Sequence, residues 1–203
     1  MSIEDKVLKD FEVGLLTIVL SLILGTLIYF VSLFTNTYPP LDMEIIIKRI
    51  VALTPSEFSP LTLSFIFMSI LDLSAFHKLR NGFRILNSGT HYGGTGLSLL
   101  IISSIFLLFG NIELLLSGFL FLMTKIIIFA WIAFMVVSIV FGMAGTLLLG
   151  LEFRNLGNLY KNNQIEKGAI LIMSVILSYV GYIIVYVGIR NLRNQKSLSR
   201  QNL

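Results

Sequence analysis

The chain has 203 residues, of which 56% are hydrophobic and 13% charged, about half of the roughly 25% charge of an ordinary soluble domain. Mean hydropathy is +0.89, and the absence of cysteine excludes disulfides, thiolate metal sites and a cysteine nucleophile. The formal net charge of +4 comes from 15 Lys and Arg clustered at the ends of apolar runs, which indicates anchoring to headgroups rather than nucleic-acid binding.

Five apolar segments are predicted to cross the membrane as helices. Each is long enough for a hydrocarbon layer of roughly 30 Å. The longest stretch left between them has 24 residues, too few for a soluble catalytic domain. The first segment lacks a small-residue cleavage pattern, so we expect it to stay in the mature protein. The predicted spans are 11–34, 59–76, 96–117, 127–150 and 168–189.

The longest connection is expected to contain an interfacial amphipathic helix over 42–54. Asp42 can cap this helix, and its apolar residues follow the i, i+3, i+4, i+7 spacing. Thr54 before Pro55 ends it. Its simplest role is to shield the edge of the bundle, and docking of a partner is the alternative.

These elements predict an all-α, polytopic membrane helix bundle that forms one integral membrane domain over residues 1–203. With five spans the two ends of the chain lie on opposite sides of the membrane. Lys and Arg then divide eight against seven between the sides, which does not decide the orientation by the positive-inside rule. Six of the eight lie in short hairpin loops, so we favour a cytoplasmic N-terminus.

Two similar segments suggest a hairpin that is used twice. The residues 82–86 and 152–156 both contain Phe-Arg-x-Leu, and each is followed by a predicted helix that begins at glycine, Gly96 and Gly168. The bundle would then consist of one lone helix and two hairpin repeats. Chance similarity between Leu- and Ile-rich helices is the alternative.

Several glycine-containing segments resemble a known family. They are the Gly82-Phe83 turn, the glycine run 93–96 and the segment 167–189. On these residues the chain resembles, up to about residue 190, an uncharacterised multi-pass membrane family of thermoacidophilic archaea of the Sulfolobus kind. The resemblance implies an archaeal membrane rich in tetraether lipids. It supplies no activity, because the family is one of unknown function.

Three ionisable residues lie within or beside the predicted spans, where charges are costly and each is a site candidate: Asp72, Glu113 and Lys125. Asp72 is expected near headgroup depth in an ion pair with a neighbouring Lys or Arg, and a proton relay is the alternative. Glu113 and Lys125 flank the tight turn between the third and fourth spans, so we expect them to pair.

Small residues recur every four positions along the fourth predicted span, at Ser138, Gly142, Thr146 and Gly150. Such a stripe lets helix backbones approach closely inside a membrane. We expect it to pack within the chain's own bundle, and a homodimer face is the alternative.

Arg80, Arg84 and Arg154 are candidate contacts to lipid headgroups. The glycine run 93–96 opens a predicted helix, so its backbone N–H groups could also bind a headgroup phosphate near Arg80 and Arg84. The run lacks the Gly-Lys-Ser/Thr ending of a nucleotide-binding loop.

Catalytic and metal-binding patterns are missing from the sequence. It contains no Gly-x-Ser-x-Gly, no His-Glu-x-x-His and no paired aspartates at catalytic spacing. His77 and His91 flank a single polar connection outside the hydrocarbon core, where two imidazoles would not share one cavity. We therefore expect no catalytic residue, cofactor or metal, and no enzyme.

The expected function is that of a non-catalytic component of the cell membrane, either an accessory or scaffolding subunit or a lipid-organising protein. Its expected partners are membrane lipids and other membrane proteins or a second copy, and not nucleic acid. A small channel or transporter for a neutral solute or an ion is the alternative, although most mid-helix positions are Leu, Ile, Val or Phe.

Overall fold

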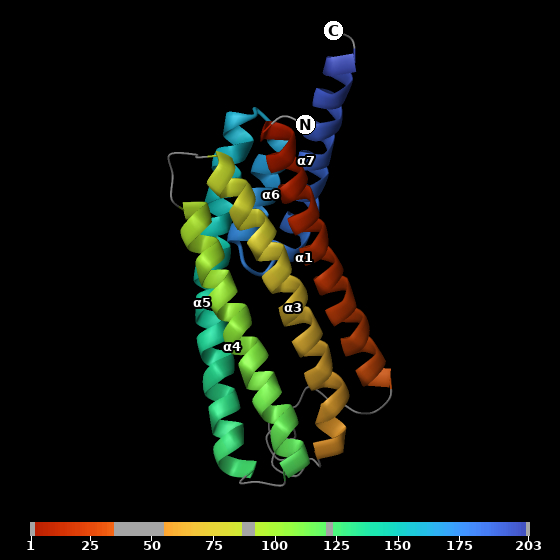
Figure 1. Cartoon of the computed structure of the whole chain (residues 1–203), viewed down its shortest axis with the longest axis vertical. Coiled ribbons are helices and arrows are strands. Elements are labelled where there is room, and N and C mark those ends of the chain that lie inside the picture. Colours follow the sequence, from red (N-terminus) through yellow and green to blue (C-terminus); the bar gives the residue numbers. More distant parts are fainter. Residues whose placement is uncertain (1–2, 35–54, 87–91, 121–123, 202–203) are drawn as a thin grey trace.

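The protein is all-helical over the residues that the computed structural model describes, which are 3–34, 55–86, 92–120 and 124–201 (Figure 1). The all-α prediction is confirmed for these residues. The interfacial helix predicted at 42–54 lies outside them. The six helices are α1 (Ile3–Phe34), α3 (Pro55–Leu86), α4 (Tyr92–Leu120), α5 (Thr124–Leu159), α6 (Asn163–Met173) and α7 (Ser178–Gln201).

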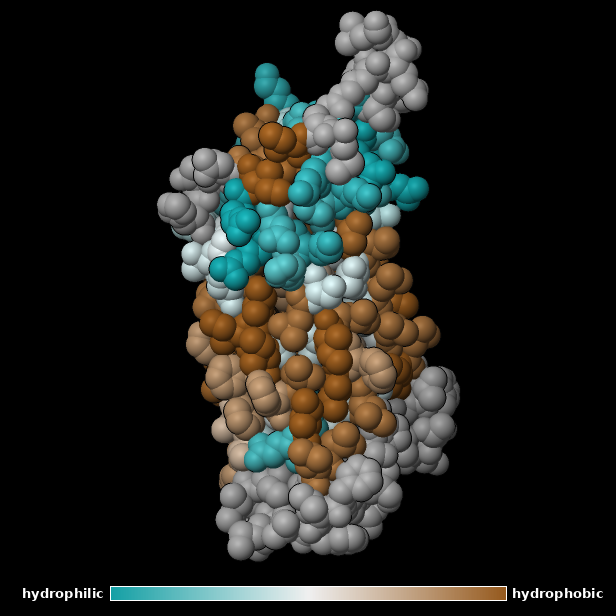
Figure 2. All heavy atoms as spheres, in the orientation of Figure 1, coloured by the Kyte–Doolittle hydropathy of each residue, from teal (hydrophilic) through white to brown (hydrophobic). Residues whose placement is uncertain are grey.

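Four helices carry segments that are long and apolar enough to cross a membrane: Ile3–Ile28, Thr62–Leu86, Tyr92–Leu116 and Phe129–Leu159. They overlap the first four predicted spans. At 1.5 Å per residue, α1 with its 32 residues is about 48 Å long and exceeds a hydrocarbon layer of roughly 30 Å. Figure 2 shows the corresponding division of the surface, with hydrophilic residues at one end and an apolar band below them.

The predicted fifth span over 168–189 is not a single helix. α6 ends at Met173, the chain turns over residues 174–177, and α7 begins at Ser178. With 11 residues α6 is about 16 Å long, roughly half of what a crossing needs. The prediction was wrong because the turn contains no Gly or Pro and is largely apolar. Hydropathy averaged along the sequence therefore does not detect the break. Val175 adopts the left-handed conformation there, with φ of 59°.

The six helices pack as a closed ring. Each helix contacts the next one along the chain, and α7 returns to pack against α1. In Figure 1 the start of α1, the end of α5, the start of α6 and the end of α7 all lie at the upper end of the bundle. α6 therefore runs away from that end and α7 runs back to it.

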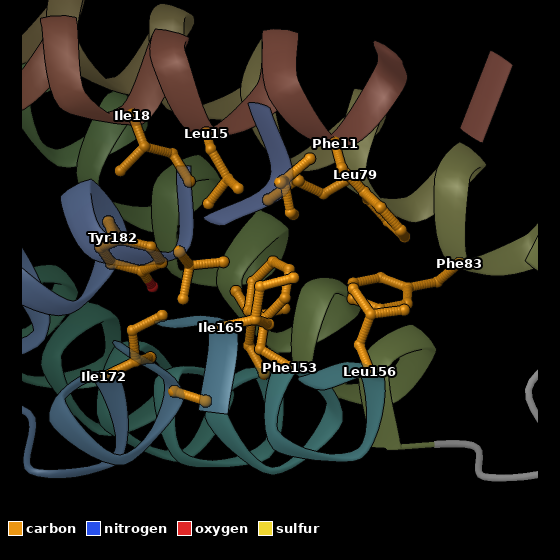
Figure 3. Packing of buried hydrophobic residues seen from close by; sticks show 14 of the residues in the cluster. Phe11, Leu15, Ile18, Leu79, Phe83, Phe153, Leu156, Ile165, Ile172 and Tyr182 are labelled. Carbon is orange, nitrogen blue, oxygen red and sulfur yellow. The ribbon is translucent and has the colours of Figure 1, made fainter. Parts of the chain in front are cut away.

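The buried core joins the helices near the upper end (Figure 3). Its centre is a group of three aromatic rings, in which the Phe83 ring centroid lies 4.5 Å from that of Phe11 and 5.4 Å from that of Phe153. Ile165 and Ile172 bring α6 into the same cluster, and both are fully buried. α1, α3, α5 and α6 thus share one core although they are far apart in the sequence.

Glycine lets α6 and α7 approach until their backbones touch. A Cβ atom at Gly181 would lie 2.6 Å from the carbonyl oxygen of Gly168 and 2.6 Å from the backbone nitrogen of Ile172. A Cβ atom at Gly168 would lie 2.9 Å from the Gly181 carbonyl oxygen. The same kind of contact joins α4 to α5, where a Cβ at Gly96 would lie 2.9 Å from the Gly145 carbonyl oxygen. Only glycine fits at these positions.

Replacing Gly181 by Ala is expected to destabilise the bundle by about 1–2 kcal/mol. Overpacking against backbone atoms costs about 1–3 kcal/mol, and the better helix propensity of Ala offsets up to about 1 kcal/mol. Unfolding in a titration with dodecyl sulfate, followed by circular dichroism, measures the effect. Gly94→Ala is the matched control, because nothing lies within 4 Å of its Cβ position. Equal unfolding midpoints for the two variants would show that α6 and α7 do not touch.

Candidate functional site

Hydrophilic residues gather at the end of the bundle that holds both the start of α1 and the end of α7 (Figure 2), and most of the Lys and Arg belong to this end. We call this end the charged end. Of the thirteen Lys and Arg in the described ranges, only Lys125 lies at the opposite end, where α5 begins. The twelve at the charged end are Lys6, Lys9, Lys78, Arg80, Arg84, Arg154, Lys161, Lys167, Arg190, Arg193, Lys196 and Arg200.

Two ion pairs join α7 to α1 at the charged end. Arg193 Nη1 pairs with Glu12 Oε2, and Lys196 Nζ pairs with Glu4 Oε1. Lys196 Nζ also lies 4.5 Å from the centre of the Tyr160 ring, just beyond the end of α5. Partly exposed pairs contribute only about 0–1 kcal/mol each. Their main consequence is therefore to select which helix α7 meets, since the acidic face of α1 attracts the basic face of α7.

Burial and the Glu4 carboxylate keep Tyr160 in its neutral form. Burial and the Glu4 carboxylate together raise the pKa of the Tyr160 hydroxyl to about 12, because the hydroxyl donates a hydrogen bond to Glu4 and the carboxylate charge opposes ionisation. Tyr160 thus connects the end of α5 with the start of α1.

Arg80, Arg84 and Arg154 are exposed at the charged end and form no ion pair with any residue in the described ranges. Phe83 and Phe153, each one position before an arginine, meet in the core. The inward contact of the two phenylalanines leaves Arg84 and Arg154 on the surface beside it. Arg80 precedes Arg84 by four residues and lies on the same face of α3. The candidate headgroup residues are therefore exposed cations on adjoining parts of one end.

The glycine run at the start of α4 packs against neighbouring helices. A Cβ atom at Gly93 would lie 2.7 Å from Cγ of Glu152, and Gly96 contacts the α5 backbone. Glu152 is 1% exposed. A buried carboxyl side chain beside a helix N-terminus fills the place that an anion would otherwise take. This packing does not support the hypothesis that the run binds a headgroup phosphate.

Polar side chains from four helices also lie within the apolar region, just below the charged end. We call Ser21, Asp72, Thr146 and Tyr182 the inner polar cluster. The Ser21 hydroxyl donates to the Asp72 carboxylate and lies 3.5 Å from the Met68 carbonyl oxygen. The buried Tyr182 hydroxyl is hydrogen-bonded to Thr146, whose own hydroxyl donates to the Gly142 carbonyl oxygen at 2.8 Å. Asp72 makes no ion pair with a described residue, so hydroxyl groups take the place of the expected Lys or Arg.

Glu113 lies in α4, toward the end of the bundle opposite the charged end. Its Oε2 atom is buried and has no hydrogen-bond partner within the described part of the chain. The side chain of Lys125 lies outside the described residues, and the expected pair between the two stays a prediction. Asp72 and Glu113 belong to different ends of the apolar region and do not form one site.

The four small residues predicted as a stripe on α5 face other helices of the same chain: Ser138, Gly142, Thr146 and Gly150. Ser138 and Ser103 of α4 bond reciprocally, each hydroxyl donating to the other residue's carbonyl oxygen at 3.0 Å and 2.8 Å. Gly142 also faces Ser103, Thr146 bonds to Tyr182 of α7, and Gly150 lies against α6. The stripe thus contacts three neighbouring helices.

Sequence reasoning missed Ser21, Ser103 and Tyr160. The two serines could have been noted as hydroxyls inside apolar spans, where a polar group needs a partner. Tyr160 carries no such signal, because its partners come from the two ends of the chain. Within the described ranges no three His, Asp or Glu side chains are grouped so that they could hold a metal ion.

The apolar helices and the charged end are those of a helical membrane protein. The sequence matches the family model described as a protein of unknown function, DUF973, over residues 4–203. The chain therefore belongs to this family. This confirms the prediction that it is a member of a family of unknown function. No curated protein and no solved structure matches it.

The ionisation of Tyr160 is expected to loosen the contact between α1 and the end of α5 at high pH. Because its pKa rises from 10.0 to about 12 on folding, its contribution to stability is present below pH 10 and is lost as the pH rises toward 12. The difference in tyrosinate absorbance between the wild type and Tyr160→Phe measures this pKa. Glu4→Gln should lower it. A Tyr160 difference signal that titrates at pH 10 would contradict the contact.

Proposed function

We propose that the protein is a non-catalytic, lipid-organising component of the membrane that binds anionic headgroups at its charged end. The observation that carries this proposal is the set of three exposed arginines, Arg80, Arg84 and Arg154, which have no ion-pair partner among the described residues. Each Lys or Arg near an anionic membrane surface contributes about 1 kcal/mol. Guanidinium groups also bind phosphate through paired hydrogen bonds.

The contact between Phe83 and Phe153 supports the placement of this site. The rings lie 5.4 Å apart and are buried, so the backbone next to each is fixed by the core. Arg84 and Arg154 follow directly, where the charged end meets the apolar band. Headgroup phosphates occupy this depth of a bilayer. The acidic residues Glu4 and Glu12 are engaged with α7 and do not neutralise these arginines.

The same contact supports a hairpin repeat, because Phe83-Arg84 and Phe153-Arg154 occupy equivalent places in the two similar segments. The repeat is incomplete, since α4 continues for 29 residues whereas α6 ends after 11. We assign the protein to the cell membrane of a thermoacidophilic archaeon on the resemblance of its glycine-rich segments alone. Its partner lipids would then have tetraether chains. A role as a scaffolding subunit for other membrane proteins is compatible with the same surface.

Neutralising Arg84 and Arg154 together is expected to weaken binding of an anionic lipid about 30-fold, from about 1 kcal/mol for each cation. A fluorescent short-chain phosphatidylglycerol, titrated into the protein in a zwitterionic detergent, measures the dissociation constant. Lys125→Gln, at the other end of α5, should leave it unchanged. The proposal fails if Arg84→Gln/Arg154→Gln binds the lipid as tightly as Lys125→Gln, or if the wild type binds none.

The inner polar cluster favours a second candidate function, a small transporter or channel. A carboxyl group, a phenol and two hydroxyls from α1, α3, α5 and α7 converge within the apolar region, where such groups often mark a path for protons or solutes. Against it, the partners of Thr146 and Tyr182 are protein groups that fill the cluster.

Proton flux in liposomes that contain only this chain separates the two functions. The lipid-organising role predicts flux equal to that of protein-free liposomes, and equal thermal stability for Asp72→Asn and the wild type. A transporter predicts flux under a pH gradient that Asp72→Asn abolishes and that Lys125→Gln leaves intact. Observation of that pattern would replace the first proposal by the second.

A further inference from the structure

The last two helices point to a membrane topology that differs from a simple succession of crossings. We infer that α6 and α7 form a hairpin that enters the membrane from the charged end and returns to it, so that both ends of the chain lie on the same side. This inference does not depend on the proposed lipid binding. It rests on the lengths and contacts of the two helices, on the hydrogen bonds of their turn, and on the distribution of charge.

α7 ends at the charged end, beside the start of α1 (Figure 1). α6 starts at the charged end and covers only about 16 Å with its 11 residues. α7 then runs antiparallel to α6, held against it at Gly181 and at Gly188, where a Cβ would lie 3.1 Å from the Ile165 backbone nitrogen. Arg193 and Lys196 near its end pair with α1. Residues close to both ends of the chain thus meet directly.

The N–H groups of the turn residues are all paired within the hairpin. Each of the five consecutive N–H groups from Ser174 to Ser178 donates to an acceptor within the hairpin. The Ser174 hydroxyl also donates to the Leu171 carbonyl oxygen, and the Ser178 hydroxyl to that of Val175, both at 2.7 Å. A turn in water needs no such internal satisfaction, whereas an unpaired N–H in hydrocarbon costs several kcal/mol.

The side chains of the hairpin agree with its backbone. Ile176 at the tip is 89% exposed, and Leu177 beside it is 49% exposed. The exposed apolar surface continues along both helices, through Ile170, Val180, Ile183 and Val187. A tip of two exposed large apolar residues, whose own N–H groups are paired within the hairpin, fits acyl chains as its neighbours. The hydrophobic effect favours such a surface in lipid.

The depth of the tip follows from its contacts with α5. Tyr182, five residues after Leu177 at the tip, is hydrogen-bonded to Thr146. Thr146 precedes Arg154 by eight residues, which is about 12 Å along the helix axis. The tip precedes Tyr182 by five residues, about 8 Å along α7, so it lies on the order of 12–20 Å into a hydrocarbon layer of about 30 Å. It enters the membrane and stops short of the other side.

The charge distribution then decides the orientation. If 168–189 crossed the membrane, the four cations of α7 would leave the side of the N-terminus, and the described Lys and Arg would divide eight against five. Because the hairpin returns, twelve of the thirteen described Lys and Arg share one side. An excess of this size marks the cytoplasmic face. Both ends of the chain are therefore assigned to the cytoplasm.

The absence of cysteine makes the topology directly testable by single-cysteine labelling. Lys9→Cys and Asn194→Cys are at exposed positions in α1 and α7, and Ile176→Cys is at the tip. A membrane-impermeant maleimide is applied to intact cells and to inside-out vesicles, and variants that elute as the wild type are compared. We expect labelling at positions 9 and 194 in the inside-out vesicles but not in intact cells. We expect no labelling at position 176 in either preparation.

Three outcomes would overturn the inference. Labelling at 194 but not at 9 in intact cells shows that the last segment crosses. Labelling of both positions in intact cells shows that the charged end is extracellular. Labelling of 176 in vesicles as fast as 194 shows that the tip is in water. Labelling of each variant in detergent is the control for chemical accessibility. The outcome of the experiment does not depend on the proposed lipid contacts of Arg84 and Arg154.

Discussion

The backbone contact between α6 and α7 at Gly168 and Gly181 decides where the last part of the chain goes. In lipid the hydrophobic effect does not drive helices together, so close packing and hydrogen bonds must do so. Glycine permits the closest packing, and here it holds α7 antiparallel to an α6 too short to cross. α7 consequently reaches α1, and the ring of six helices closes. The contact of Gly96 with Gly145 joins α4 to α5 by the same means.

Ring closure brings together the groups that give the charged end its character. The pairs Arg193–Glu12 and Lys196–Glu4 use two of the four acidic residues of α1, and Arg80, Arg84 and Arg154 have no ion-pair partner among the described residues. Below them, the rings of Phe11, Phe83 and Phe153 fix α1, α3 and α5 against one another. The arginines that follow two of these rings are therefore held on a rigid base. The proposed binding of lipid headgroups depends on these exposed cations beside the apolar band.

The first four spans could be predicted from the sequence because hydropathy is a sum of local residue properties. The break at 174–177 could not, since Val175 takes a positive φ in a turn that lacks Gly and Pro. Arg84 and Arg154 could be selected because each follows a phenylalanine in a similar segment. The pair of Glu12 with Arg193 joins residues 181 positions apart. No local pattern predicts such a pair, so the contact of α7 with α1 could not be predicted from the sequence.

The distance between spin labels at Lys6→Cys and Gln195→Cys, measured by double electron–electron resonance in lipid nanodiscs, tests the return of α7 most directly. Both positions are exposed, and neither takes part in the ion pairs of Glu4 and Glu12. With α7 packed on α1, the main population should lie within about two helix diameters, roughly 24 Å. A main population beyond the hydrocarbon thickness of about 30 Å would show that the final segment crosses the membrane, and would contradict the closed ring.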